Sequence, residues 1–523
     1  MNDDRPVDLH DVQGNIIKAY PRLGFPRARY LFLRIGDGKL GRQFLAKLLP
    51  LVTTSAPWLQ RGSAADGSAR PQVATNVAFT FEGLRRLGVP QASLQTFPEA
   101  FASGMKARRA ILGDDGPSAP EHWDAIWQDP DPVHVFIAIN GGTFEQIHQV
   151  YEHILALGVD GTAIKLIDGH RAPDGKTLPY QDASAIFIND EATPREHFGY
   201  ADGISNPFFK GSLADSSNVV GGGKRKGDDG WEPLETGEFL LGYRDEALEY
   251  PAAPVPNLLG DNGTYLVYRK LHENVGSFEE YLNEAGAKYP GGREALAAKM
   301  AGRWRNGAPL VHYPTEQSAN QFAEEWAEAK MRIAGSANPA ERAHAKRQFG
   351  KLNEKMVDFD YTEDLPGGRC PIGAHTRRAH PRSALEFGAT GAFERPDALS
   401  NRRRILRRGI PYGDSRDRTD NQGEHGVIFM ALGADIARQF EFVQQQWINY
   451  GNDFRLANDK DPLLGNHGKG GGRFLVETDP ADPAPPHFCS KIPRFVETRG
   501  GDYFFVPSLT ALRMIADGIV DPT

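Results

Sequence analysis

Short apolar segments with strand character alternate with segments of helical spacing through the first third of the chain, and this alternation is the feature that most restricts the fold. Runs of β-branched and aromatic residues predict strands, whereas apolar residues spaced i, i+3, i+4 predict helices. The predicted strands are residues 29–35, 74–81, 133–139 and 162–166, and the predicted helices are residues 42–49, 82–87 and 144–157, the last with Thr143 as N-cap. This order of elements is typical of a split βαβ, ferredoxin-like unit.

The second half of the chain repeats the pattern. The predicted strands are residues 264–270, 427–432 and 503–506, and they lead to predicted helices at residues 277–285, 436–447 and 509–516. Residues 314–356 differ, because they are rich in Ala, Glu, Lys and Arg with helical spacing. We therefore expect an α+β fold of two similar halves, with an inserted helical hairpin that is not a core element.

Composition excludes several classes of protein. The chain has 523 residues, with 60 Lys and Arg against 68 Asp and Glu, so its net charge is −8. It lacks the excess of basic residues that is typical of proteins that bind nucleic acid. Cys370 and Cys489 are the only cysteines, too few for a disulfide framework or a cysteine-rich metal site. The acidic N-terminus lacks the pattern of a signal peptide, and no run of about 18 apolar residues occurs. We expect a soluble cytoplasmic protein that contacts neither nucleic acid nor membrane.

The loop sequence HFGYADG, residues 197–203, is the first of three segments that could carry chemistry. Glycines on both sides of Asp202 allow tight turns and close approach of the backbone to a large ligand. An acid held beside apolar residues could transfer protons with a perturbed pKa. The alternative is an aspartate that only forms an Asx-turn.

The second segment is RCPIGAHTRRAHPR, residues 369–382. Gly373 and Ala374 before His375 would let a flat macrocycle lie near the backbone. The guanidinium groups of Arg377, Arg378 and Arg382 could pair with ligand carboxylates. An imidazole with nearby guanidinium groups suits haem, as axial ligand and propionate anchors, although a single histidine is more often an ordinary surface or core residue.

The third segment is RRRILRRGIPYG, residues 402–413. It could be a basic strand at a solvated sheet edge. However, Ile405, Arg407 and Gly409 share one strand face, so Arg407 could point inward, where it would need an anionic partner or substrate.

At these three places the sequence resembles the dye-decolorizing peroxidases, haem enzymes of the ferredoxin-like superfamily. The family's G-x-x-D-G motif is matched by Gly199, Asp202 and Gly203, its proximal-histidine segment by CPIGAHTRRAHPR, and its distal-arginine segment by ILRRGIPYG. Further similar segments, in the family's order, are DVQGNI, ATNVAFTFEGLRRLG, FGYADGISNP, AKMAGRWRNGAPL, DFDYTEDLPGGRCPIGAH and GGDYFFVPSL.

The resemblance implies two ferredoxin-like domains with antiparallel sheets, residues 1–205 and residues 206–523, with haem bound mainly by the second. It implies one haem b per chain, with His375 as the axial ligand of the iron. Asp202 and Arg407 would be catalytic on the opposite haem face, and Gly199, Gly203 and Arg377 would also contact the cofactor.

A carboxylate should accept the second N–H of the axial histidine and raise its basicity. For this partner of His375 we expect Asp435, with Glu441 as the alternative.

The activity implied is a haem peroxidase that uses hydrogen peroxide to oxidise dyes, phenols and other one-electron donors through ferryl intermediates. An aspartate base, with a reference pKa of about 3.9 against about 6.5 for histidine, leads us to expect an acidic optimum. Bulky donors could be oxidised at a surface radical site, for which Tyr412 is the first candidate and Trp447 and Tyr450 are the next.

Two other functions remain open at this point. One is a haem-handling, deferrochelatase-like protein, and the other is a binding or scaffold protein on a degenerate ferredoxin-like fold. A homo-oligomer is possible in each case.

Overall fold

The N-terminal half of the chain forms an antiparallel sheet whose order is β2-β3-β1-β4. Its strands are β1 (Arg27–Ile35), β2 (Val73–Phe79), β3 (Val135–Gly141) and β4 (Ile164–Leu166), and its main helices are α2 (Gly38–Leu48), α3 (Phe81–Arg86) and α8 (Phe144–Ala156). Thr143 caps α8 in a capping box, as the sequence predicts. The computed structural model describes residues 5–58, 69–172, 175–212, 219–226, 230–386, 397–414, 421–478 and 483–520.

The C-terminal half adds a second antiparallel sheet of order β13-β15-β12-β18. Its strands are β12 (Thr264–Glu273), β13 (Leu406–Arg407), β14 (Ile410–Tyr412), β15 (Gly426–Gly433) and β18 (Val496–Val506), and two of its helices are α10 (Val275–Gly286) and α16 (Leu509–Asp517). Each predicted strand and helix is present. Most ends differ by a few residues, but β18 begins seven residues before the predicted strand 503–506. The α+β prediction of two ferredoxin-like, antiparallel units is confirmed.

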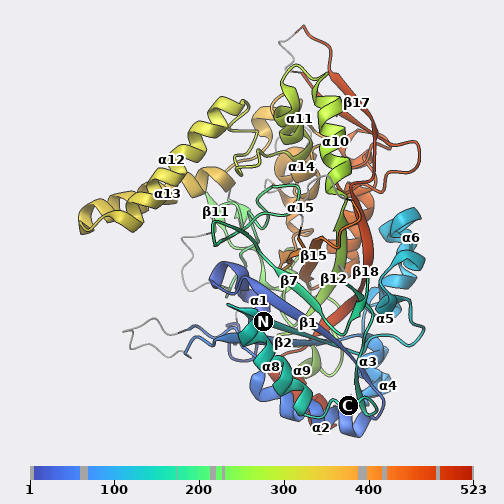
Figure 1. Ribbon diagram of the computed structural model, residues 1–523. Coiled ribbons are helices and arrows are strands. Elements are labelled where there is room, and N and C mark those ends of the chain that lie inside the picture. Colours follow the sequence, from blue (N-terminus) through green and yellow to red (C-terminus); the bar gives the residue numbers. More distant parts are fainter. Residues whose placement is uncertain are drawn as a thin grey trace.

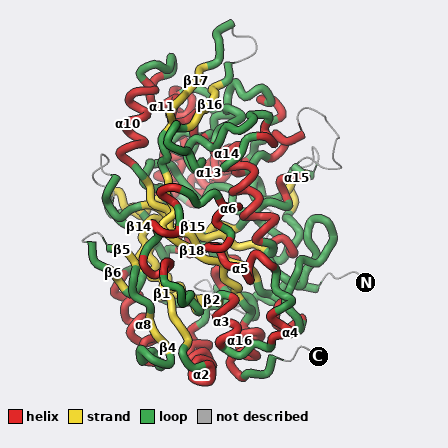
Figure 2. The backbone as a smooth tube through the Cα atoms, turned by 90° about the vertical axis from the view of Figure 1, so that its right-hand side faces the viewer, coloured by secondary structure: helices red, strands yellow, loops and turns green. Residues whose placement is uncertain are grey.

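The two sheets join into one. Phe505 of β18 pairs with Phe79 of β2, which links the halves edge to edge. On the other side, β7 (Gln181–Ser184) pairs with β1 and contacts β14. The strands cross the centre of the molecule and helices cover them, as Figures 1 and 2 show.

Aromatic side chains from both halves share one buried core between the strands. Tyr30 and Phe32 of β1 lie within 6 Å of the Tyr268 ring of β12, at 5.9 and 5.2 Å between centroids. Phe136 of β3 packs 5.3 Å from Phe504 of β18. Rings in such tilted and edge-to-face pairs add stability beyond the area that they bury.

A domain boundary near residue 205 remains our proposal. The strands of the two sheets divide at that point, but α16, at the end of the chain, returns to pack against α2 of the first half. Among the described residues, no helix is long and apolar enough to cross a membrane.

The predicted insertion is a helical hairpin of α12 (Glu316–Gly335) and α13 (Pro339–Val357), which projects from the body of the molecule in Figure 1. Its base, however, belongs to a buried cluster: Phe322 and Leu352 pack with Trp304, Tyr361 and other residues that include Ala374. The expectation that the hairpin is not a core element is therefore wrong for its base. Helical spacing places these apolar residues on the inner faces of both helices, so they can bury against the body.

We expect the two parts of the hairpin to differ in their contribution to stability. Phe322→Ala should lower the free energy of unfolding by about 3–5 kcal/mol, because it removes a buried aromatic ring. Met331→Ala, on the exposed part of the same helix, should change it by no more than about 0.5 kcal/mol. Urea denaturation of the two variants measures the difference, and equal, small effects would contradict a structural role for the base.

Candidate active site

A cavity of about 330 Å³ lies between the sheet of the C-terminal half and the loops that carry the three predicted segments. Asp202, His375 and Arg407 all line it, so the structure brings together residues that are far apart in the sequence. The sheet contributes alternate residues from the end of β12: Arg269, Leu271 and Glu273.

His375 begins the short helix α14 (His375–Ala379), and a hydrogen bond fixes its ring. Its Nδ1 lies 2.9 Å from Oδ2 of Asp461, a fully buried carboxylate whose Oδ1 accepts the amides of Leu463 and Leu464. Because a carboxylate only accepts, Nδ1 donates, and Nε2 is left as the basic nitrogen. The His375 side chain is 29% exposed, because it faces the cavity.

The two groups perturb each other's pKa. Desolvation raises the pKa of Asp461, but His375 and the backbone amides outweigh it, so this pKa is lowered. Desolvation lowers the pKa of His375, but the Asp461 carboxylate outweighs it, so this pKa is raised. Asp461 is therefore an ionised partner that orients the imidazole.

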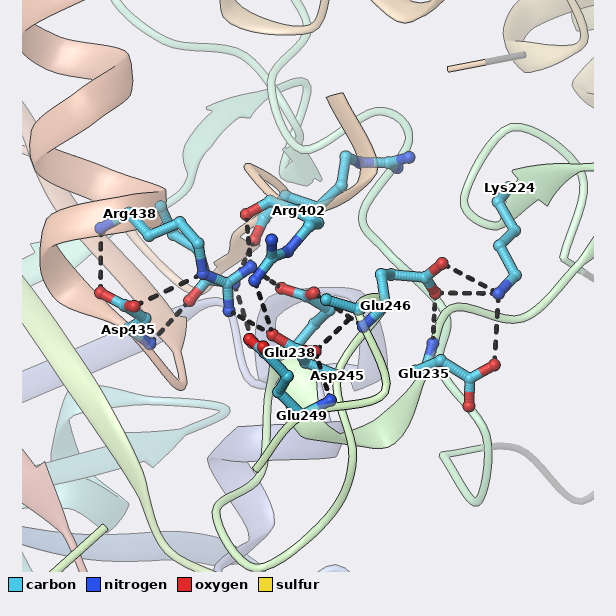
Figure 3. Close-up of polar contacts among 12 residues, drawn as sticks. Lys224, Glu235, Glu238, Asp245, Glu246, Glu249, Arg402, Asp435 and Arg438 are labelled. Carbon is cyan, nitrogen blue, oxygen red and sulfur yellow. Dashed lines mark hydrogen bonds and ion pairs between the residues drawn. The ribbon is translucent and has the colours of Figure 1, made fainter. Parts of the chain in front are cut away.

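Neither predicted carboxylate partner contacts His375. Asp435 caps the following helical turn through the amide of Arg438 at 2.9 Å, and Figure 3 shows it in a charged network with Arg438 and Glu238. Glu441 binds Arg108 and accepts from the Tyr503 hydroxyl at 2.9 Å. The prediction that Asp435, or alternatively Glu441, is the carboxylate partner of His375 is wrong, because both acids bind other groups.

The partner was missed because Asp461 lies 86 residues after His375 in a loop with no regular element. The only local signal is the sequence Asp461-Pro462-Leu463-Leu464, in which an acid precedes a turn that it can cap.

Asp202 lines the same cavity as His375 and lies on a tight loop. Gly199 and Gly203 have φ values of 95° and 74°, a region that favours glycine, so they shape the loop. Neither glycine lines the cavity, so the structure does not support the predicted contact of these two residues with the cofactor. Nη1 of Arg407 lies 2.5 Å from Oδ1 of Asp202, and Nη2 donates to the carbonyl of Ile204 at 2.8 Å. The inward Arg407 thus has the anionic partner that the sequence requires.

The electrostatics of the loop keep Asp202 charged. Desolvation raises the pKa of Asp202, but Arg407, the amide of Gly203, His375 and Arg22 together lower it below its usual range. Its side chain remains 46% exposed, because it faces the cavity. Asp202 is thus a carboxylate able to accept a proton from a cavity ligand.

Arg377, predicted to bind a ligand carboxylate, points away from the cavity. It donates to the carbonyl of Cys370 at 2.7 Å, pairs with Asp364 and lies 4.4 Å from the Tyr361 ring centre. On a helix, positions i and i+4 share a face but i and i+2 do not, so Ala379 lines the cavity with His375 whereas Arg377 does not. The prediction for Arg377 is wrong for this reason.

Other arginines line the cavity, namely Arg269, Arg303, Arg382, Arg403, Arg404 and Arg407. Burial and the neighbouring Arg382 lower the pKa of Arg404 to about 9, and burial lowers that of Arg303 to about 10. A wall of crowded, buried cations favours an anionic ligand. The arginines placed to meet a ligand carboxylate in the cavity are therefore these residues and not Arg377.

The helix after β15 has π-helical geometry over Ile436–Glu441 and Val443–Ile448. This helix corresponds to the predicted helix 436–447. Four of its side chains line the cavity: Phe440, Val443, Gln444 and Trp447. Such wide turns often occur at functional sites.

The three candidate radical residues occupy different environments. Tyr412 is 2% exposed, with Nζ of Lys270 4.9 Å from its ring centre, so the expectation of a solvent-facing ring is wrong. Trp447 is buried but lines the cavity, and Tyr450, three residues on, is 43% exposed. Nη1 of Arg378 donates to the carbonyls of both, at 2.9 and 3.2 Å.

These features fit haem. The imidazole of His375 presents Nε2 to the cavity, the arginines suit two propionates, and Phe359, Phe440 and Leu463 give apolar walls.

Comparison with known proteins finds peroxidases of one kind along nearly the whole chain. The family model of the DyP dimeric alpha+beta barrel domain matches residues 11–171. Dye peroxidase DyP2 of Amycolatopsis is 28% identical over 97% of this chain and 96% of its own length. Peroxidase 2 of Mycetinis scorodonius is 27% identical over 97% of this chain and 87% of its own.

A solved structure of an ancestral D-type dye-decolorizing peroxidase is 26% identical, covers 97% of this chain and 99% of its own, and superimposes with a TM-score of 0.72. Similarity in sequence and fold over nearly the whole chain supports its assignment as a peroxidase of the dye-decolorizing type.

Proposed function

We propose that this peroxidase binds one haem b per chain and uses hydrogen peroxide to oxidise dyes, phenols and other aromatic one-electron donors. One observation supports this most. His375, whose ring is bonded to Asp461, lines the same cavity as the ion pair of Asp202 and Arg407. A solved protein of the same fold was studied with 2,6-dimethoxyphenol, which makes that phenol a suitable test donor.

His375 would hold the haem iron through Nε2. Asp461 accepts the proton of Nδ1, which fixes the tautomer and increases the basicity of the ligand nitrogen. Arg303, Arg382 and Arg404 line the cavity where they could hold the propionates. When bound, haem supplies the redox chemistry of the reaction.

Asp202 and Arg407 would act on the peroxide itself. The Asp202 carboxylate accepts the proton of one peroxide oxygen and returns it to the other oxygen, which leaves as water. The Arg407 guanidinium stabilises the negative charge that develops as the O–O bond polarises. Because the pair is preorganised by contacts to Gly203 and Ile204, little rearrangement is needed.

The first test concerns the ligand of the iron. His375→Ala should abolish the haem Soret band or greatly reduce haem content, because it removes the imidazole that the Asp461 carboxylate orients at the cavity wall. His380→Ala is the matched control, since His380 lines the same cavity, and it should keep the band. Absorbance spectra of both variants decide the assignment, and a wild-type spectrum of His375→Ala would refute it.

The same spectra also separate the proposed activity from haem handling. Addition of peroxide and donor to the wild-type holoenzyme should give repeated turnover with the haem intact. Release of iron without donor oxidation would instead support a deferrochelatase-like protein.

The second test concerns Asp202 and Arg407. Asp202→Asn should slow the reaction with peroxide by about 10²–10⁴-fold, the usual contribution of a general base. Arg407→Leu should slow it by about 10²–10³-fold, because one preorganised donor is lost. Stopped-flow rates that match the wild type in both variants would eliminate this pair as the peroxide site.

Arg407→Leu should also change the pH dependence. The rate is lost as pH falls through the pKa of Asp202, which burial raises and Arg407 lowers. Without Arg407 the desolvation remains, so the acid limb of the rate profile should move to higher pH.

The third test concerns bulky donors. We propose a radical path from the cavity through Trp447 to the exposed Tyr450, since these residues lie at the cavity wall and the surface. Tyr450→Phe should reduce turnover of a bulky anthraquinone dye severalfold and leave the reaction with peroxide unchanged. The buried Tyr412→Phe is the control, and a loss of dye turnover there but not in Tyr450→Phe would reverse the assignment.

A further inference from the structure

Two carboxyl groups that the peroxide chemistry above does not use lie in the cavity wall near Asp202. Glu196 follows β9 (Glu191–Thr193) and begins the loop that carries Asp202, and Glu273 ends β12. Both line the cavity, and Glu273 is 5% exposed.

Backbone amides of the same loop hold the two groups. Glu196 accepts the amides of Phe198 and Tyr200, each at 2.7 Å, and Glu273 accepts the amide of His197 at 3.2 Å. Because the amides of consecutive residues, His197 and Phe198, bind the two carboxyl groups, these groups lie close together. Two buried carboxyl groups so close, with no cation between them among the described residues, cannot both be ionised, so the pair holds at least one proton.

The charges around the pair favour this protonated state. Within the part of the chain that the structure describes, neither carboxyl group forms an ion pair, and Asp202 adds a third negative charge nearby. The arginines around it are engaged elsewhere: Arg269 with Asp114, Arg305 with Glu294 and Arg407 with Asp202. His197, whose amide contacts Glu273, is itself buried, and burial lowers its pKa.

The pKa values agree with one shared proton. Burial raises the pKa of Glu273 well above its usual range, and Glu196 contributes to the rise. Burial raises the pKa of Glu196 to about 7, although the two amides oppose it.

A buried hydroxyl of the same loop lies at the cavity wall, on the residue whose amide binds Glu196. Tyr200 is 9% exposed and lines the cavity, and its hydroxyl has no hydrogen-bond partner among the described residues. Buried hydroxyls are normally satisfied by a protein group, water or a ligand. This hydroxyl is therefore placed to bond a ligand or solvent molecule of the cavity.

We propose that Glu196 and Glu273 share one proton and act as the proton store of the peroxide site, with the Tyr200 hydroxyl as the relay into the cavity. The inference rests on the proposed function. Reduction of one peroxide to two waters consumes two electrons and two protons. Donors oxidised at the surface release their protons outside, so two protons must enter the cavity in each turnover, one for each electron. The pair gives up its proton and regains one from solvent.

Infrared spectroscopy tests the shared proton without turnover. At pH 7 the infrared spectrum of the haem-loaded wild type should contain the C=O stretch of a protonated carboxyl group, which shifts in D2O. The spectrum of Glu273→Gln should lack this band. Glutamine keeps the shape of the side chain, and the Soret band checks that the variant is folded and loaded. Loss of carboxylate bands alone would show two ionised groups and overturn the proposal.

Turnover tests the delivery of the proton. Glu273→Gln should lower kcat at neutral pH by at least about tenfold, below the usual ~10²–10⁴-fold of a general acid because solvent can partly replace it. The loss should shrink as pH falls, and the initial reaction with peroxide should remain close to wild type.

Glu477→Gln is the matched control, because burial also raises the pKa of Glu477 to about 7 but its side chain does not line the cavity. Equal effects of the two variants on kcat would overturn the delivery role.

Tyr200→Phe tests the relay. It should keep the protonated carboxyl band and lower kcat with the same pH dependence as Glu273→Gln. A wild-type profile would show that the proton does not pass through Tyr200. Failure of the wild type to react with peroxide would remove the proposed function, whereas the infrared result would still decide whether the pair shares a proton.

Discussion

The pairing of β12 between β15 and β18 is the constraint on which the site depends. The pairing of β12 with β15 is regular, whereas its pairing with β18 shifts register once, between Lys270 and Leu271. This pairing fixes which residues share a face, because side chains alternate with a period of two. Arg269, Leu271 and Glu273 therefore face the cavity together with Val427 and Phe429 of β15 and Val496 and Thr498 of β18. A slip of one residue would turn this whole wall away from the cavity. The loops with Asp202 and His375 are then placed against a rigid surface.

Local patterns in the sequence were sufficient to predict the sheet, and the family resemblance pointed to Asp202, His375 and Arg407, which line the cavity. Strand 264–270 and helix 144–157 have clear periodicity and, for the helix, a capping residue, so their positions follow from short-range physics. Glycines at 199 and 203 likewise mark the turn around Asp202. These signals lie within a few residues of the feature that they predict.

The features that sequence reasoning missed depend on contacts across the fold. Asp461 meets His375 only because a loop far along the chain returns beneath α14, and no periodicity marks it. Arg377 was expected in the site because it lies two residues from His375, but the single helical turn of α14 puts it on the opposite face. Tyr412 is in a Pro-Tyr-Gly turn, which is commonly exposed, yet here His197 and Lys270 cover it. In each case tertiary packing decided the orientation.

The helical hairpin offers a route for attaching other molecules to this enzyme. Its base touches the site indirectly, since Nη1 of the cavity residue Arg303 donates to the carbonyl of Met356 near the end of α13 at 2.9 Å. Its outer end, around the turn between Gly335 and Pro339, is far along both helices from that contact. A fluorescent label or a tether to a solid support placed at this turn would project away from the cavity. The same attachment near Met356 would disturb an arginine of the cavity wall.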